Sequence, residues 1–177
     1  MKQTQDLNFE KLIGKEIEFI DDNIRAYELS SKRSRLLLDN AAYGSNASVN
    51  LTNQIVSTYG TAIRVLGDLK KILKDVNTLD MLGNLNESID DTIENINKGL
   101  EDIQDNIRSS RLYTYDYLQL EKQQLELNET LTIYGAMLDR LKALHGSFNP
   151  APSVPEEVVK KEPVDKKPSK KTTEKEA

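Results

Sequence analysis

The sequence contains no cysteine, one histidine and no long apolar run, and each shortage excludes a class of protein. Without cysteine the chain cannot form disulfides, thiolate metal sites or a cysteine nucleophile, which agrees with a reducing compartment. No run of about eighteen apolar residues exists, so we expect no transmembrane span. The stretch from Met1 to Phe9 lacks the apolar core of a signal peptide, because Asp6 stands where that core would lie. We therefore expect a cytoplasmic protein.

Residue patterns that carry chemistry are equally scarce. His145 is the only histidine, and no glutamate precedes it by three residues as a di-iron helical bundle requires, so we expect an exposed imidazole and no metal. Gly60 and Gly67 fall inside an expected helix and form no phosphate-binding loop. We expect no catalytic residues, no cofactor and no small-molecule substrate.

The positions of proline and glycine divide the chain in two. All five prolines follow position 149, whereas all eight glycines lie at or before Gly146. Residues 147–177 hold seven Lys against five Glu and one Asp, with little to bury. A segment of this composition cannot offset its own ordering entropy. The sequence predicts a helical coiled-coil body over 1–146 and a disordered Pro/Lys/Glu-rich tail over 147–177.

The tail has two interpretations that the sequence leaves open. It is either a segment that tethers a partner or a solubilising extension without one. A short linear binding motif would use the tail's valines, which are Val154, Val158, Val159 and Val164.

The longest apolar repeat lies near the end of the body. At alternating steps of four and three it reads Tyr113, Tyr117, Leu120, Gln124, Leu127, Leu131, Tyr134, Leu138, Leu141 and His145. This spacing is typical of a helix with one buried stripe, which must lie against other helices.

Two further helices are expected in the first half of the chain. Asp6 can cap a first helix that reaches about Asn40, and 43–48 has the composition of a loop in which Ser48 caps the second helix. The apolar stripe of the second helix, from Ile55 to Val76, is broad enough for two neighbours.

The third expected helix begins at a turn marked by Gly83 and Asn84, with Glu87 completing a capping box. It is strongly acidic, so it either stays in water or meets a basic surface. The repeat then slips by three residues across 108–111, which indicates either a stammer in a continuous helix or a short turn between two helices. We favour a continuous or slightly kinked helix because neither glycine nor proline is present.

These patterns together predict an all-α fold of three or four long amphipathic helices in an antiparallel hairpin bundle or coiled coil. Four apolar stripes exceed what so short a chain can cover, so we expect a homo-oligomer. The residues expected to line the bundle or oligomer seam are Ile93, Ile96, Leu100, Ile103, Leu127, Leu131, Tyr134, Leu138 and Leu141.

Basic residues supply a second candidate site, for phosphate or nucleic acid. If the first two helices form a hairpin, one cationic patch could gather Lys32, Arg33, Arg35, Lys70, Lys71 and Lys74. The net charge of −5 argues against attraction of nucleic acid over the whole surface. The lack of interleaved aromatics and of a helix-turn-helix pattern argues against base reading. The alternative is that these cations offset the acidic third helix.

In architecture alone, a helical hairpin body with a charged tail is similar to the small packaging subunits (terminase small subunits) and scaffolding proteins of tailed phages, and to many bacterial adaptors. That similarity implies an oligomer that engages partners through terminal segments. We therefore expect a non-enzymatic assembly protein, a scaffold or adaptor that binds itself and another protein. The alternative is a DNA-packaging small subunit that binds DNA through the basic residues.

Overall fold

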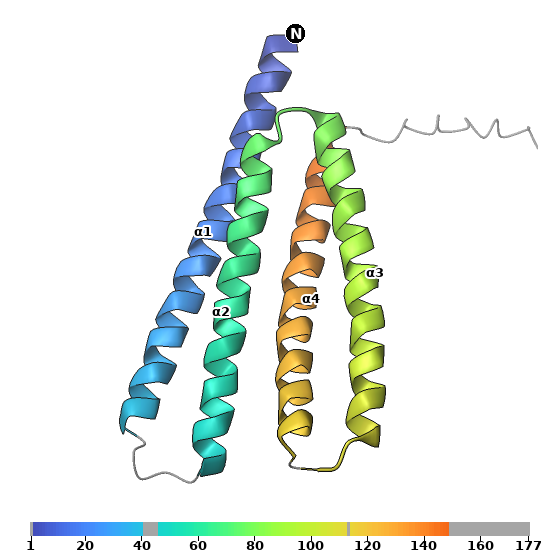
Figure 1. Cartoon of the computed structure of the whole chain (residues 1–177). Helices are drawn as coiled ribbons and strands as arrows, with labels where there is room; N and C mark the ends of the chain where they lie inside the picture. The colour runs from blue at the N-terminus through green and yellow to red at the C-terminus, as the bar shows by residue number, and fades with distance from the viewer. Residues whose placement is uncertain (1, 41–45, 113, 149–177) are drawn as a thin grey trace, which may run out of the picture.

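Over the residues that the structure describes, the chain forms four long α-helices that lie side by side (Figure 1). This computed structural model describes residues 2–40, 46–112 and 114–148. The helices are α1 (Lys2–Asn40), α2 (Asn46–Asp75), α3 (Leu79–Ser109) and α4 (Tyr115–Phe148). Successive helices run in opposite directions, and the described residues contain no strand. The predicted all-α antiparallel hairpin bundle is confirmed.

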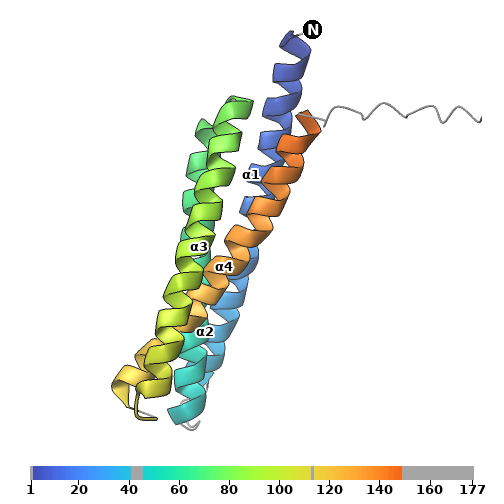
Figure 2. The same ribbon diagram turned by 90° about the vertical axis from the view of Figure 1, so that its right-hand side faces the viewer.

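The helices pack as two hairpins joined through their second members. α1 packs along α2, α3 packs along α4, and α2 also packs against α4. In Figure 1 the α2–α4 pair lies between α1 and α3. Figure 2 shows α1 and α4 side by side near the end that carries the N-terminus. We call this the proximal end, which also holds the α2–α3 turn, and we call the opposite end the distal end.

The apolar core occupies the proximal half of the bundle. Its largest fully buried side chains come from all four helices, and they are Ile20, Leu69, Leu73, Leu82, Met137 and Leu141. Burying each such side chain contributes on the order of 1.5–3 kcal/mol. Among the described residues two polar side chains are also buried, Asn86 of α3 and Thr130 of α4, and the Oδ1 of Asn86 has no hydrogen-bond partner there.

The α2–α3 turn lies earlier in the chain than expected. α2 ends at Asp75, and Thr78 caps α3 by accepting a hydrogen bond from the Met81 backbone N–H at 3.2 Å. A turn marked by Gly83 and Asn84 is therefore wrong, since both residues lie inside α3. Thr78 is itself a good capping residue, and buried Val76 anchors the turn to the core.

A turn also separates α3 from α4, so the expected continuity across 108–111 is wrong. The hydroxyls of Ser109 and Ser110 donate to the Asn106 carbonyl at 2.9 and 2.7 Å. These bonds satisfy a carbonyl that would otherwise need the next turn of helix. Thr114 then accepts from the Tyr117 backbone N–H at 3.3 Å and caps α4.

Helix ends differ from the sequence expectation at three places. α1 begins at Lys2, so Asp6 lies within the helix and does not cap it. α2 begins at Asn46, so Ser48 is likewise helical. α4 runs past Gly146 to Phe148, whose ring meets Phe9 of α1 edge-on with centroids 5.4 Å apart. The end of α1 at Asn40 is as expected.

Candidate interaction surface

The distal half of the interface between α1 and α4 is polar. Tyr27 of α1 donates a hydrogen bond from its hydroxyl to Oε1 of Glu129 on α4. Burial, followed by that hydrogen bond, raises the pKa of Tyr27 well above its usual value of about 10. The Tyr59 ring of α2 lies beside it, with centroids 5.9 Å apart. Tyr27 therefore stays a neutral donor to the carboxylate.

A second polar contact lies one turn further toward the distal end. Ser57 of α2 donates a hydrogen bond to Oε1 of Glu126 on α4 at 2.6 Å, and Lys122 lies 3.8 Å from the same oxygen. All three residues are partly buried. Carboxylate, hydroxyl and ammonium groups thus occupy positions that the proximal half fills with Leu and Met.

The distal part of α1 continues the change from apolar to polar. Ser30, Ser31 and Ser34 are partly buried, whereas Leu36 and Leu37 are 60% and 66% exposed. The small polar residues of this segment lie toward the bundle, and these two leucines lie toward solvent. This inverts the arrangement of the proximal half of α1, where apolar residues such as Ile20 are buried.

Exposed apolar side chains concentrate at this same end. Among the described residues, nine large apolar side chains are exposed, and only Ile72 and Met81 of these lie near the proximal end. The other seven, between 41% and 75% exposed, are Leu29, Leu36, Leu37, Leu51, Leu112, Tyr115 and Leu125. Where such side chains form a contiguous patch, they are typical of surfaces that bind other macromolecules.

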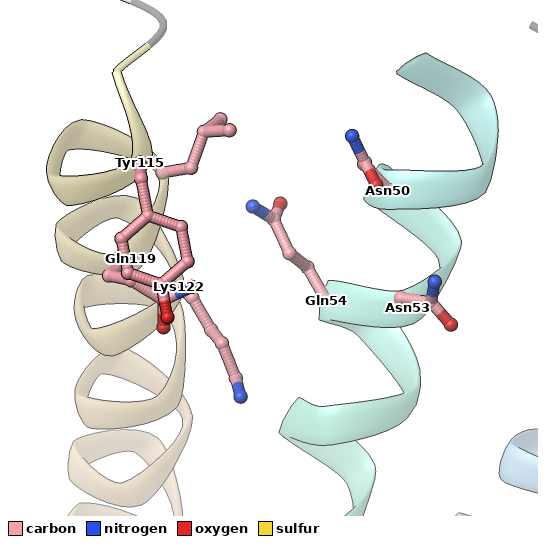
Figure 3. A pocket seen from close by; sticks show the side chains of 7 residues that line it. Asn50, Asn53, Gln54, Tyr115, Gln119 and Lys122 are labelled. Atoms are coloured by element: carbon pink, nitrogen blue, oxygen red, sulfur yellow. The ribbon is translucent and has the colours of Figure 1, made fainter. Parts of the chain in front are cut away.

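A cleft between α2 and α4 opens at the distal end (Figure 3). Its volume is about 290 Å³, and its lining residues are Asn50, Asn53, Gln54, Tyr115, Leu118, Gln119 and Lys122. In Figure 3, Gln54 and Lys122 extend from the two helices into the space between them. Four side-chain amides and one phenol offer both donors and acceptors, which suits the polar groups of a protein chain.

In the proximal half, by contrast, α1 and α4 are joined by a charged pair with two hydrogen bonds and by a cation–π contact. Arg140 of α4 donates two hydrogen bonds to the Glu16 carboxylate of α1, at 2.6 and 3.1 Å. The guanidinium also lies 3.7 Å from the centroid of the Phe19 ring, at cation–π distance. Glu16 and Tyr27 of α1 contact Arg140 and Glu129 of α4, respectively. The separation in residues between the two α1 members equals that between the two α4 members, and the order along the chain is reversed. One antiparallel register therefore covers both halves, and only the chemistry changes.

The predicted basic residues fall into two separate groups. Lys32, Arg33 and Arg35 are exposed on distal α1. Lys70 is bonded to Asp21, which lies eleven residues before Lys32 and hence about 16 Å from it along the helix axis. Near Lys70, Lys71 pairs with Asp68 at 2.9 Å and Lys74 is exposed. The structure thus does not bring the six cations into one patch.

Of the predicted seam residues, Leu100, Leu138 and Leu141 are buried. The others are partly buried, and they are Ile93, Ile96, Ile103, Leu127, Leu131 and Tyr134. Burial and the nearby Asp68 carboxylate raise the pKa of Tyr134. Sequence reasoning missed a second stripe on α4, formed by Thr130, Ile133, Met137 and Leu144. The steps of three, four and seven between these residues are helical spacings, so the sequence contained the signal for this stripe.

We expected an exposed side chain at His145, but it is partly buried. Its ring lies over Gly83, where an added Cβ would come within 3.5 Å of the His145 Nε2. The described residues contain no group of three or more His, Asp or Glu side chains that could hold a metal ion. No helix in the described ranges has the length and apolar character needed to cross a membrane. The valines of the predicted tail motif lie outside the residues that the structure describes, and they are Val154, Val158, Val159 and Val164.

We compared the chain with models of known families, with curated proteins and with solved structures, and none of the three comparisons found a match.

Proposed function

We propose that this chain is a non-enzymatic assembly protein of the cytoplasm, a scaffold or adaptor that associates with itself and with another protein. The observation that carries the proposal is the distal end, where the core turns polar and large apolar side chains turn outward. An end built in this way gains stability when a second protein surface covers it.

Burial of apolar surface area supplies the free energy of association. Removing seven large apolar side chains from water is worth on the order of 1.5–3 kcal/mol each when burial is complete. Only part of that free energy survives the cost of association, but a few well-buried side chains carry most interfaces. The polar residues that surround them, such as Gln54 and Lys122, can supply the hydrogen bonds of an interface rim.

A DNA-packaging function draws less support. DNA binding needs several free cations close together, since each neutralised phosphate contributes through counterion release. Lys70 is engaged with Asp21 and lies far along the axis from Lys32 and Arg33. A gel-retardation assay at low and moderate salt separates the two functions. We expect no shift, and a salt-sensitive shift lost on replacing the basic residues with Gln would favour the DNA-binding function.

The self-association part of the proposal is tested by light scattering on the full chain across the micromolar range. We expect a mass above that of one chain, 20.1 kDa, which rises with concentration. A single-chain mass at every concentration would contradict it. Deleting 149–177 then tests whether the tail contributes to capture of a second protein, since helicity is expected to stay unchanged.

A further inference from the structure

Two surfaces at the distal end differ in charge, and each combines charged with exposed apolar residues. The first, which we call the basic leucine surface, consists of Leu29, Lys32, Arg33 and Leu36 of α1. The second, which we call the acidic surface, consists of Glu101, Asp102 and Asp105 of α3 with Leu112 and Tyr115 of the α3–α4 turn region. All nine residues are exposed.

The basic leucine surface is one continuous helix face. Its members stand at i, i+3, i+4 and i+7, the spacing that places side chains on one side of an α-helix. No acidic residue occurs from Leu29 to Leu38, so this segment carries a net positive charge. The serines of this segment lie toward the bundle, and Leu29 and Leu36 are left for a contact outside it.

The acidic surface has the matching composition. Glu101, Asp102 and Asp105 lie on one side of α3 by the same spacing rule. Asp105 pairs with Arg108 at 2.9 Å, but both side chains are about three-quarters exposed, and such a pair is worth little. Leu112 and Tyr115, 65% and 75% exposed, supply the apolar part next to these carboxylates in the chain.

One copy of the chain cannot join these two surfaces. α1 and α3 are the outermost helices in Figure 1, and the α2–α4 pair lies between them. Both surfaces nevertheless lie at the distal end, so two copies placed side by side can bring them together at the same height. The occupant that fits each surface in both charge and apolar character is therefore a second copy of this chain.

We propose that the basic leucine surface of one copy docks on the acidic surface of a second copy. The inference rests on the self-association in the proposed function and adds which residues make the contact. Because the contact joins two different surfaces, each copy of a pair keeps its other surface for a further neighbour. Lys32 and Arg33 meet carboxylates, and Leu29 and Leu36 meet Leu112 and Tyr115.

The test uses paired charge reversals in the full chain, followed by native mass spectrometry and light scattering. Variant one carries Lys32→Glu and Arg33→Glu, and variant two carries Asp102→Lys and Asp105→Lys. Each alone places like charges across the contact, so we expect the association constant to fall by roughly tenfold or more. An equimolar mixture restores opposite charges across the contact, and we expect assemblies that contain both variants.

Matched controls lie on the same two helices near the proximal end. Lys11→Glu with Lys15→Glu changes exposed residues of α1, and Glu87→Lys with Asp91→Lys does so on α3. We expect both control variants to assemble like the wild type. Circular dichroism verifies helicity, and a charge-reversed variant that loses it is replaced by Leu29→Gln with Leu36→Gln, which tests the apolar half of the same contact.

The outcomes separate the two claims. A wild-type chain that stays single at all concentrations contradicts self-association and this inference with it. A wild-type chain that assembles, with both charge-reversed variants assembling equally well, overturns this inference and leaves the proposed function standing. Dispersal of each variant without recovery in the mixture shows that the two surfaces do not pair with each other.

Discussion

Tyr27 of α1 and Glu129 of α4 form the hydrogen bond at which the core of the bundle changes character. Toward the proximal end the facing residues are Ile20, Leu69 and Met137, all fully buried. Toward the distal end they are Ser31, Ser57 and Glu126, all partly buried. One half of the molecule is therefore stabilised by its own apolar core, whereas the other half exposes several of its leucines to solvent.

Replacing Tyr27 with Phe removes this hydrogen bond and leaves the partly buried Glu129 carboxylate without its donor. We expect a loss of about 1 kcal/mol in the free energy of unfolding, because a hydrogen bond to a charged group is lost at a site that water still reaches. Urea denaturation followed by circular dichroism measures it. Tyr115→Phe, at an exposed site, is the control, and equal stability of the two variants would contradict the structural role of Tyr27.

Raised tyrosine pKa values predict a loss of stability in alkali. The pKa values of Tyr27 and Tyr134 lie above the value of about 10 that tyrosine has in the unfolded chain. The folded state therefore holds these protons more tightly, and the stability they contribute is present in full below about pH 10. It is lost as the pH rises toward the folded-state pKa values.

Tyrosinate absorbance and helicity, recorded together against pH, measure this effect. We expect two of the seven tyrosines to ionise late and together with unfolding. In the variant Tyr27→Phe with Tyr134→Phe, stability should fall less steeply above about pH 10. Simple titration of all tyrosines near their usual pKa, without loss of helix, would contradict the burial of these two side chains.

Arg140 provides a test of the proximal half. Arg140→Ala removes two hydrogen bonds to Glu16 and the contact with the Phe19 ring, and it leaves the Glu16 side chain, 14% exposed, without its cation. We expect a loss of roughly 1–3 kcal/mol in unfolding free energy, measured by urea denaturation. Arg25→Ala is the matched control, because its pair with Asp22 is fully at the surface and should cost little.

Asn86 predicts a change in the opposite direction. Its side chain is buried and its Oδ1 has no hydrogen-bond partner in the described part of the chain. Leu has the same number and branching of side-chain heavy atoms and no polar atom, so Asn86→Leu should raise the unfolding free energy by about 1–2 kcal/mol. Exposed Asn84→Leu is the control. A large destabilisation at position 86 would show that the Asn side chain is satisfied in solution.

Heptad spacing was enough to predict the helices and part of their contacts. Leu138 and Leu141 are buried as the apolar repeat indicates, because periodicity reports which side of a helix is apolar. It does not report which helix lies opposite. The contact of Tyr27 with Glu129 joins residues far apart in the chain, and Glu129 does not stand out among the polar residues of its own segment.

The turns and the distal surface were harder to predict for local reasons. Gly83 and Asn84 form a plausible cap, but Thr78 is another, and burial of Val76 and Leu82 decides between them.

On α1, the steps of four and three that carry Ile20, Ile24 and Tyr27 continue to Ser31, Ser34 and Leu38, which are partly buried. Leu36 and Leu37 lie outside this repeat, and both point to solvent. Their outward position follows from the packing of Ser31 and Ser34 against the bundle. Residue type alone ranks leucine above serine for burial and so does not predict this inversion, whereas the helical repeat does.

The claim that the distal end is an assembly surface is decided by sedimentation of the full chain against concentration. The wild type is compared with one variant that combines Leu29→Gln, Leu36→Gln and Leu37→Gln. The exposed leucines do not stabilise the single copy, so we expect equal helicity and thermal midpoint in both proteins. We expect the wild type to sediment as a concentration-dependent oligomer and the variant as a single chain. A wild-type protein that sediments as a single chain throughout, or a variant that assembles equally well, would contradict the claim.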